Sequence, residues 1–587
     1  MPDSYRLLQA SPAVERRIAS LGASRFVPRL FRGDASLWGR DPAARRIVRN
    51  RLGWLRAPER MLPLVPRLDA FAREVRQEGI RQVLLVGMGG SSLGVDVFAR
   101  VFPPPAGFPE ITVLDSTVPS AVRRAEARLD LGKALVIVSS KSGTTGETAA
   151  LQAYFWAKAR RRLGRDAARH FVAITDPGTP LAEEASARGY RAAFLNPPDV
   201  GGRYSALTYF GLVPAVLAGV DIGTQLRRAA AMLERCSPGV PAAENPGLAL
   251  GAALGVLARR GRDKVVLLID PALRSYGLWI EQLVAESTGK KGRGLVPIVA
   301  RGVPATMRRD LAGPDRVAVG VTLEGGAGDR AIRALLGAPR GSAAAHASGA
   351  MPRGRSGATP SIVLALRDRD DLGASMLQWE IATAVAGAVL GVNPFDEPNV
   401  TESKMNTEAL IAELSATGRF REEEPDLVKG RARVHLGGLG RLQPRSLGAA
   451  LGALRARARR GDYVAVLAYV DPADRALASS LERLRAGLAA RTGLAAGVGY
   501  GPRYLHSTGQ LHKGGPDRGL FLQVVPDDRA ALPIPGRPFG FEEFKQAQAL
   551  GDARALCGRG RRLVRARFTG TARAAVAALL KASKTIR

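Results

Sequence analysis

Short apolar runs alternate along the chain with longer stretches in which apolar residues recur at helical spacing. The runs lie at residues 83–86, 111–115, 134–138 and 171–175, and each is followed by a polar or glycine-containing turn. Short strands that alternate with amphipathic helices are typical of βαβ units, in which helices cover both faces of a parallel sheet. The sequence therefore predicts a parallel sheet in this part of the chain.

The same alternation begins again near residue 246, and a third time after a polar stretch at residues 422–429. The second series runs through a helix at 247–259 and then segments 264–269, 280–288, 317–323 and 361–366. The third series has expected strands at 463–470, 520–525 and 563–568 and expected helices at 477–490, 541–556 and 572–582.

These series predict an α/β fold with two doubly wound parallel-sheet domains, a helical N-terminal segment and a smaller C-terminal α/β segment. A stretch rich in Gly, Ala, Ser and Arg at residues 337–359 predicts a mobile loop within the second domain. The expected boundaries are 1–79 for the helical segment, 80–245 and 246–420 for the two domains, and 421–587 for the C-terminal segment.

Charge is the one unusual feature of the composition. The 587 residues are 46% hydrophobic, which is ordinary for a globular protein, but the formal net charge is +33. The excess is mostly arginine, spread along expected helices in pairs such as Arg16 and Arg17, and aromatic residues make up only 5%. Nucleic-acid binding would favour a clustered basic face, so we expect no nucleic-acid partner. A positive surface would instead steer phosphorylated small molecules inward.

Neither the N-terminus nor the interior contains a segment that predicts export or membrane insertion. The first residues lack the basic and then apolar layout of a signal peptide, and no uncharged apolar run reaches the length of a membrane helix. The two cysteines, Cys236 and Cys557, lie too far apart to form a metal or redox motif. We expect a cytoplasmic protein without a membrane partner and without a metal.

Two of the expected strands end in loops of Gly, Ser and Thr that open helices, at residues 87–92 and 139–145. Loops of this kind gather at the carboxyl edge of a parallel sheet, where helix N-termini favour a phosphate group. The first loop resembles GxGxxG, but its sixth position is Ser92, and the chain has no Gly-Lys-Ser/Thr sequence of the nucleotide-binding kind. The loops therefore favour a monophosphate over a dinucleotide.

Six blocks in order resemble the sugar-isomerase domains of glucose-6-phosphate isomerases, over about residues 80–405. They are residues 86–94 (VGMGGSSLG), 139–148 (SSKSGTTGET), 201–205 (GGRYS), 282–290 (QLVAESTGK), 391–396 (GVNPFD) and Lys404.

The resemblance implies an aldose–ketose isomerase of glycolysis and gluconeogenesis that needs no cofactor. Such an enzyme is expected to interconvert glucose 6-phosphate and fructose 6-phosphate through a cis-enediolate. Such a reaction needs a carboxylate base and a cation for the developing oxyanion, roles that the resemblance gives to Glu286 and Arg203. Gln282 lies one helical turn before Glu286, so both can project from one face of a helix. The residues expected to bind the substrate phosphate are Ser140, Ser142 and Thr145, with Gly90, Ser91 and Lys141 nearby.

Ring opening is where the chain departs from the family pattern. The resemblance implies Lys404 as one contributor, and Glu397 stands where many family members carry glutamine. A carboxylate at this position is expected to pair with Lys404 and raise its pKa. The family's usual ring-opening histidine is absent, because no histidine occurs from residue 290 to residue 340.

Three other histidines, His346, His506 and His512, are candidates for the missing ring-opening residue. His346 lies in the low-complexity insert, where its geometry would not be held. His506 and His512 lie in the glycine-rich block at residues 499–515 and could act if that block folds over the cleft. We take His512 as the acid/base candidate.

The block at 499–515 resembles the isomerase half of bifunctional transaldolase/glucose-6-phosphate isomerases, here without a transaldolase barrel. Family members commonly dimerise and complete their site across the interface, so a homodimer is expected. Two alternatives stay open: an isomerase that also accepts mannose 6-phosphate, and a sugar-phosphate-binding protein without catalysis.

Overall fold

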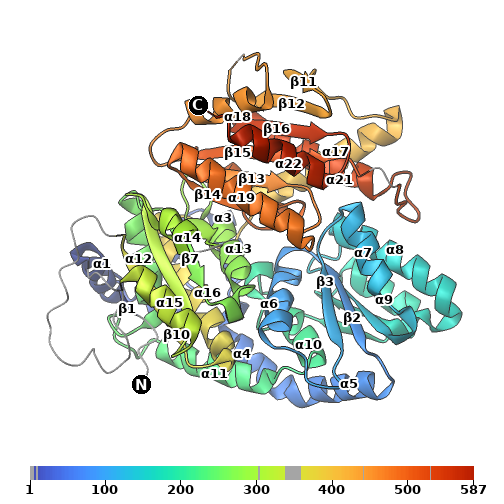
Figure 1. Ribbon diagram of the computed structural model, residues 1–587. Coiled ribbons are helices and arrows are strands. Elements are labelled where there is room, and N and C mark those ends of the chain that lie inside the picture. Colours follow the sequence, from blue (N-terminus) through green and yellow to red (C-terminus); the bar gives the residue numbers. More distant parts are fainter. Residues whose placement is uncertain are drawn as a thin grey trace.

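Three β-sheets with helices around and between them form the protein (Figure 1). The computed structural model describes residues 6–7, 11–301, 304–337, 359–440, 442–528 and 531–586. Apart from its end residues Gly337 and Thr359, the insert predicted as a mobile loop lies outside the described residues, and so does His346.

The first sheet is parallel throughout, in the order β3-β2-β4-β5-β6. Val83 and Leu85 of β2 pack in one apolar cluster with α6 and α10, whereas Leu84 and Val86 pack with α7 and α8 on the opposite face. Because successive strand residues face opposite sides, helices on both sides cover the sheet. The elements are β2 (Gln82–Gly87), α6 (Leu93–Val101), β3 (Glu110–Leu114), α7 (Pro119–Arg128), β4 (Ala134–Ser139), α8 (Gly146–Leu163), β5 (Phe171–Thr175), α9 (Pro180–Arg188), β6 (Ala192–Leu195) and α10 (Tyr209–Leu217).

The second sheet has the order β1-β10-β9-β7-β8, and only the short β1 (Arg6–Leu7) runs antiparallel. Val265 and Val266 of β7 again belong to clusters on opposite faces. The elements are α11 (Ile222–Arg235), α12 (Pro246–Arg259), β7 (Lys264–Ile269), α13 (Tyr276–Thr288), β8 (Val296–Val299), α14 (Pro304–Leu311), β9 (Arg316–Leu323), α15 (Ala327–Leu336), β10 (Ser361–Leu366), α16 (Leu372–Leu390) and α17 (Pro398–Thr417).

The third sheet is mixed, in the order β11-β12-β16-β15-β13-β14. The strand β12 runs antiparallel to both of its neighbours, β11 and β16, and the other neighbouring strands run parallel to each other. One face packs against α19 and α22, and the other shares an apolar cluster with Ala285 of α13 and Ile298 of β8. The elements are β11 (Leu427–Lys429), β12 (Ala432–Gly437), α18 (Leu447–Ala456), β13 (Tyr463–Ala468), α19 (Arg475–Thr492), β14 (Ala495–Tyr500), α20 (Gly509–Gly514), β15 (Gly519–Pro526), α21 (Phe541–Gly558), β16 (Arg562–Phe568) and α22 (Ala572–Ser583).

The N-terminal segment is helical, as predicted, and it packs on both the first and the second sheet unit. Trp38 donates from Nε1 to the carbonyl oxygen of Ala384 on α16 at 2.8 Å. Its helices are α1 (Pro12–Ala23), α2 (Phe26–Phe31), α3 (Pro42–Arg49), α4 (Ala57–Met61) and α5 (Val65–Gln77).

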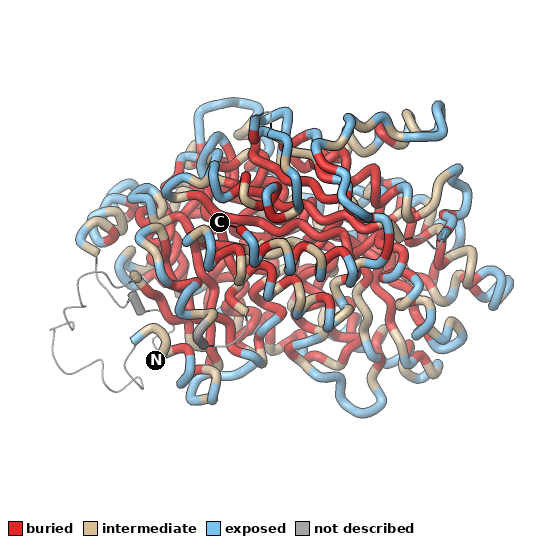
Figure 2. The backbone as a smooth tube through the Cα atoms, turned by 45° about the horizontal axis from the view of Figure 1, so that its top comes forward, coloured by how far each residue is buried: buried red, intermediate tan, exposed pale blue. Residues whose placement is uncertain are grey.

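The predicted α/β class with helix-covered parallel sheets is confirmed. Figure 2 shows buried segments running through the middle of the molecule and exposed segments at its periphery. The domain boundaries stay a prediction. The strands that were not predicted are short or glycine-containing, and they include β6, β8 and β14. Within the described ranges, no helix has both the length and the apolar character that crossing a bilayer requires.

Candidate active site

Two glycines let the loop after β2 approach the residues expected to carry the chemistry. A Cβ on Gly90 would lie 2.1 Å from the carbonyl oxygen of Gly202, and a Cβ on Gly89 would lie 2.9 Å from Nε2 of Gln282. Neither approach leaves room for a side chain, so these positions require glycine. The loop, including Ser91, therefore lies directly against the Arg203 turn and the α13 helix.

Hydroxyl side chains gather in the loop between β4 and the N-terminus of α8. Ser140 donates from Oγ to Thr145 Oγ1 at 3.1 Å, and Thr144 donates from Oγ1 to Ser142 Oγ at 3.0 Å. Ser142 and Thr144 are exposed, so a ligand can reach their hydroxyl groups. The first amide groups of α8 are free of intrahelical partners and carry partial positive charge. This combination suits a phosphate group.

Lys141, the remaining predicted residue of this loop, is engaged elsewhere. Its ammonium group forms an ion pair with Asp176 and donates to the carbonyl oxygen of Pro198 at 3.2 Å. A direct contact with a bound phosphate would have to replace these partners. Its role in substrate binding stays a prediction.

Glu286 and Gln282 project from the same face of α13, as their spacing predicts. Gln282 donates from Nε2 to Glu286 Oε2 at 3.1 Å, and both side chains are buried. Burial raises the pKa of the Glu286 carboxyl above its ordinary value, and the nearby charge of Arg203 offsets only part of this effect. A carboxylate with a raised pKa is a better proton acceptor than an exposed one.

The guanidinium group of Arg203 is buried and donates through all three of its nitrogen atoms. Burial alone would lower the pKa of Arg203, but the carboxylates of Glu286 and Glu397 outweigh it, and the pKa is raised. A permanent positive charge therefore lies against the carboxylate of Glu286. Nε donates to Ser287 Oγ (2.7 Å), Nη1 to Glu286 Oε1 (3.0 Å) and Glu397 Oε2 (2.9 Å), and Nη2 to the carbonyl oxygens of Pro394 (2.6 Å) and Asp396 (3.0 Å).

The expected ion pair between Glu397 and Lys404 is wrong, because Glu397 pairs with Arg203 instead. Glu397 precedes the first turn of α17 and reaches back to the buried guanidinium, whereas Lys404 lies about two turns further along the helix. Burial opposes ionisation of Glu397, but Arg203 outweighs it and lowers the pKa of Glu397.

A histidine of the C-terminal segment completes the group. His506, in the short 3₁₀ helix η11 (Arg503–His506), approaches Glu147 Oε1 with Nε2 at 2.8 Å. Gln548 of α21 donates to the same oxygen at 2.7 Å. Burial opposes ionisation of Glu147, but the charge and hydrogen bond of His506 outweigh it and lower the pKa of Glu147. A cavity of about 60 Å³ is lined by these three residues together with Thr144 and Lys404.

His512, the acid/base candidate chosen from the sequence, lies outside this group. Its Nδ1 lies 2.9 Å from the hydroxyl oxygen of Tyr463, and its ring packs against Phe521. Burial, reinforced by the charge of Lys513, lowers the pKa of His512 to about 3, so the ring is neutral near pH 7. Of the two histidines in this block, His506 is the one that lines the small cavity.

Glu147 was not assigned a role from the sequence, although it lies in the block at residues 139–148. Its only local signal was its place in the first turn of a helix that follows the hydroxyl loop. The partners that mark it, His506 and Gln548, lie more than 350 residues further along the chain. Only the folded chain could show that these side chains meet.

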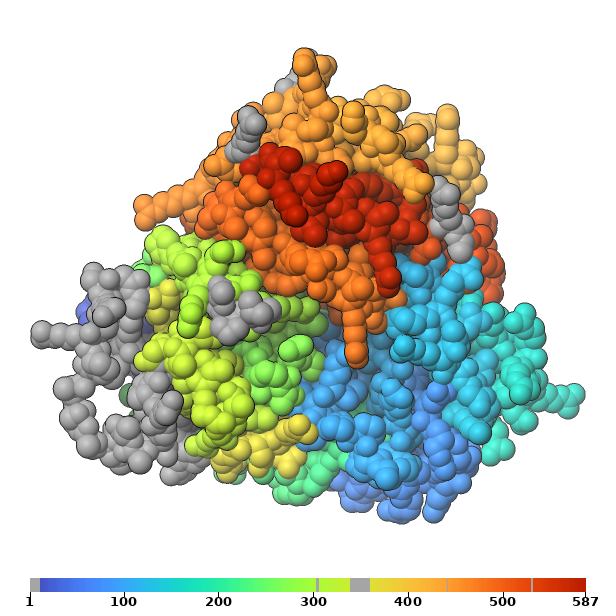
Figure 3. All heavy atoms as spheres, in the orientation of Figure 1, coloured from blue at the N-terminus to red at the C-terminus, as the bar shows by residue number. Residues whose placement is uncertain are grey.

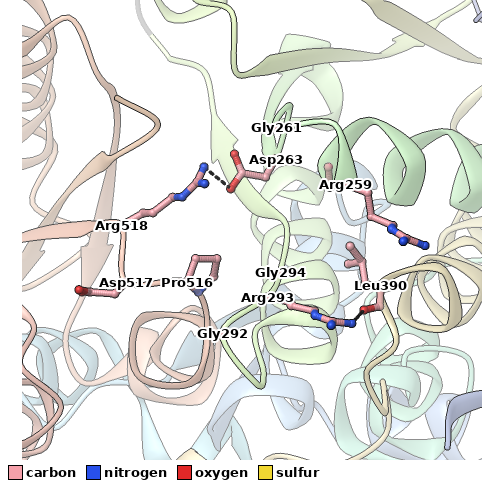
Figure 4. Close-up of a pocket in the computed structure, with 11 residues that line it drawn as sticks. Arg259, Gly261, Asp263, Gly292, Arg293, Gly294, Leu390, Pro516, Asp517 and Arg518 are labelled. Atoms are coloured by element: carbon pink, nitrogen blue, oxygen red, sulfur yellow. Dashed lines mark hydrogen bonds and ion pairs between the residues drawn. The ribbon is translucent and has the colours of Figure 1, made fainter. Parts of the chain in front are cut away.

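A larger cavity, of about 470 Å³, lies between the second and third sheet units and includes none of the predicted site residues (Figure 4). Arg518 is turned toward Asp263, and Arg293 toward the carbonyl oxygen of Leu390. These guanidinium groups face protein partners and do not converge on one point. The polar group around Glu286 is the stronger candidate for catalysis.

Comparisons with known proteins point to one family. The phosphoglucose isomerase family model matches residues 67–295. A glucose-6-phosphate isomerase of Symbiobacterium thermophilum is 32% identical over 408 residues, which cover 64% of this chain and 90% of that protein. One from Rubrobacter xylanophilus is 30% identical over 385 residues, 61% of this chain and 88% of that protein. The crystal structure of a glucose-6-phosphate isomerase from Chlamydia trachomatis shares the fold, with a TM-score of 0.55 at 19% identity over 70% of this chain and 88% of that one.

The helix-covered parallel sheets and the match to curated glucose-6-phosphate isomerases define a sugar-phosphate isomerase. The sequence matches to the two bacterial relatives extend over most of the length of those proteins. The chain belongs to the glucose-6-phosphate isomerase family.

Proposed function

We propose that this protein interconverts glucose 6-phosphate and fructose 6-phosphate. The observation that carries the proposal is the contact of 3.0 Å between Glu286 and the buried guanidinium of Arg203. The contact lies in the same site as the phosphate-binding loop, because Gln282 bonds both Glu286 and the carbonyl oxygen of His506 (2.7 Å). His506 in turn lines the small cavity with Thr144 of the hydroxyl loop.

Proton transfer is assigned to Glu286. The carboxylate takes the proton from C2 of the open-chain aldose, and the electron pair of that bond forms the C1–C2 double bond. The carbonyl oxygen on C1 becomes an oxyanion, which Arg203 stabilises. Glu286 then returns the proton to C1 while the hydroxyl proton on O2 passes to O1, which yields the ketose.

Ring opening is assigned to His506, with Lys404 as a second donor in the same cavity. The Glu147 carboxylate orients the imidazole through Nε2 and stabilises the positive charge that forms when the ring accepts a proton. We place the enzyme in the cytoplasm and, as the resemblance implies, expect it to form a homodimer.

The direct test is a coupled assay with each of the two hexose phosphates. Turnover in both directions is expected. Saturable binding of fructose 6-phosphate without turnover would make the protein a sugar-phosphate-binding protein and overturn the proposal. The same assay with mannose 6-phosphate decides whether the substrate range is wider.

Replacement of Thr145 by valine tests the phosphate loop. A hydrogen bond to a charged group contributes about 1.5–3 kcal/mol, so KM for fructose 6-phosphate is expected to rise roughly 10- to 100-fold with little change in kcat. Thr112→Val makes the same substitution in β3, outside the loop, and is the control. Equal KM values for the two variants would remove Thr145 from the phosphate site.

The titration of Lys290 is expected to set the alkaline limb of the pH profile of kcat/KM. Its buried ammonium group donates to the carbonyl oxygens of Ser287 (3.1 Å) and Asn393 (2.6 Å) and pairs with Asp396 (2.9 Å), so it holds the loop that bonds Arg203. Burial lowers the pKa of Lys290 to about 8. The group is mostly charged at pH 7 and loses its charge as the pH rises through about 8.

We therefore expect kcat/KM to decline above about pH 8 in the natural enzyme. In Lys290→Arg the decline should move to higher pH, because a guanidinium keeps its charge. Steady-state rates from pH 6 to pH 10 measure this. An identical alkaline limb in both proteins would mean that Lys290 does not cause it.

A further inference from the structure

The C-terminal unit packs directly on the helix that carries the proposed catalytic base. Ala285, the residue before Glu286, shares an apolar cluster with Leu505 and Leu511 of the C-terminal unit. In the space-filling view, the C-terminal part, orange to red, lies against both the green second unit and the blue first unit (Figure 3). The unit therefore meets both halves of the site.

The joint with the second unit is closely fitted. A Cβ on Gly289, at the end of α13, would lie 2.4 Å from Cα of Leu511, and a Cβ on Gly514 would lie 2.4 Å from Oδ1 of Asn399. Gln510 donates from Nε2 to the carbonyl oxygen of Gly289 at 3.0 Å and to Asn399 Oδ1 at 2.8 Å. Backbone contact this close leaves no gap for another chain at this joint.

Two bidentate ion pairs fasten the same unit to the first sheet unit. Arg503 donates to both carboxylate oxygens of Asp115, just after β3, at 2.6 and 2.7 Å. Arg124 of α7 donates to both oxygens of Asp471 at 2.5 and 2.7 Å. Arg503 belongs to the same one-turn helix as His506, so the first pair fixes the backbone that presents the imidazole.

The side chains of His506 and Gln548 extend from the C-terminal unit to Glu147 of the first sheet unit. Both side chains bond the buried carboxylate of Glu147, and Gln548 also accepts from the hydroxyl group of Thr117 at 2.7 Å. The base Glu286, the cation Arg203 and the ring-opening histidine are thus brought together by one polypeptide.

We propose that each chain completes its own isomerase site, with His506 acting in cis and Gln548 holding Glu147 in position. This rests on the proposed function and differs from the sharing of a site across a dimer that the family resemblance implies. Self-association is then irrelevant to catalysis, and a protomer turns over substrate independently of its neighbours.

The test is complementation between Glu286→Gln and His506→Ala, produced together with two different affinity tags. If the site is complete within one chain, every site lacks one of the two groups, and the mixed sample has no more activity than the separate variants. If a partner supplies His506, half of the dimers are mixed and each contains one intact site, which restores about a quarter of natural activity. Such recovery would overturn the proposal, and so would near-natural turnover by His506→Ala alone.

The failure of this proposal is separable from the failure of the proposed function. If the natural enzyme does not turn over either hexose phosphate, the function is wrong; if it does and the mixture recovers activity, only the single-chain site is wrong. Should size-exclusion chromatography show a monomer that is fully active, the single-chain site is supported directly.

Gln548→Leu tests the positioning residue. We expect kcat to fall about tenfold with KM nearly unchanged, because a freed Glu147 holds the imidazole less well. The matched control is Gln546→Leu on the same helix, since Gln546 bonds Asp527 and Glu542 instead. If both variants behave alike, Gln548 has only a structural role.

Discussion

Glu286→Gln is expected to lower kcat for both directions of the isomerisation by about 10³-fold or more, since a positioned acid/base group contributes about 10²–10⁴. The amide keeps the shape of the side chain and can still accept a hydrogen bond from Arg203, but it cannot take up a proton. The phosphate loop lies on a different element, so the dissociation constant for fructose 6-phosphate should stay within about threefold. Coupled kinetics and calorimetric binding measure the two effects.

The control for this variant is Glu281→Gln on the same helix. Burial raises the pKa of Glu281 to about 7, so the carboxyl is already partly neutral near neutral pH and the amide changes little. Its turnover should remain close to natural. If Glu286→Gln were also active, Glu286 would not be the base. If Glu286→Gln lost both its activity and its affinity for the sugar phosphate, the loss of activity would be explained by a loss of binding.

Arg203→Met is expected to lower kcat/KM by about 10²–10³-fold, the usual cost of removing a preorganised charge beside a developing oxyanion. It should also destabilise the fold by about 3–5 kcal/mol, because the buried carboxylate of Glu286 loses its partner. Arg203→Lys retains a charge but not the fork of donors that reaches Ser287, Glu286 and two backbone carbonyls. It should recover stability more than activity.

The pH profile provides a second measure of the role of Arg203. The guanidinium lowers the pKa of Glu286, so its removal raises that pKa further and moves the acid limb of kcat/KM to higher pH. Arg228→Lys is the control, because Arg228 is also bound by two carboxylates, Asp368 and Asp371, outside the site. An unshifted acid limb in Arg203→Met would contradict a direct contact between Arg203 and the titrating base.

Much of the fold could be predicted from the sequence because its signals are local. The strand expected at 171–175 and the one at 361–366 have the same bounds as β5 and β10. Uninterrupted apolar runs bounded by turns leave few alternatives to a buried strand. The strands that were missed, such as β8 with its four residues and a proline, carry too little pattern to be distinguished from loops.

Some features of the candidate site could likewise be predicted from local sequence, whereas others depend on contacts between distant residues. The i, i+4 spacing of Gln282 and Glu286 on one helix is a local property, and their shared face follows from helix geometry. The choice between His506 and His512 is not local, since both occur in one glycine-rich block. Only the packing of η11 and α20 shows that His512 faces Tyr463, while His506 faces Glu147.

The sequence by itself determined the α/β class, because periodicity is a property of neighbouring residues. The family resemblance of its motif blocks supplied the loops expected to bind phosphate and the proposed base and cation, Glu286 and Arg203. The tertiary structure alone decided that Glu397 serves Arg203 rather than Lys404, and that the C-terminal unit delivers a histidine to the cleft. Both depend on contacts between residues 194 and 359 positions apart, which arise from how the sheet units pack rather than from any pattern along the chain.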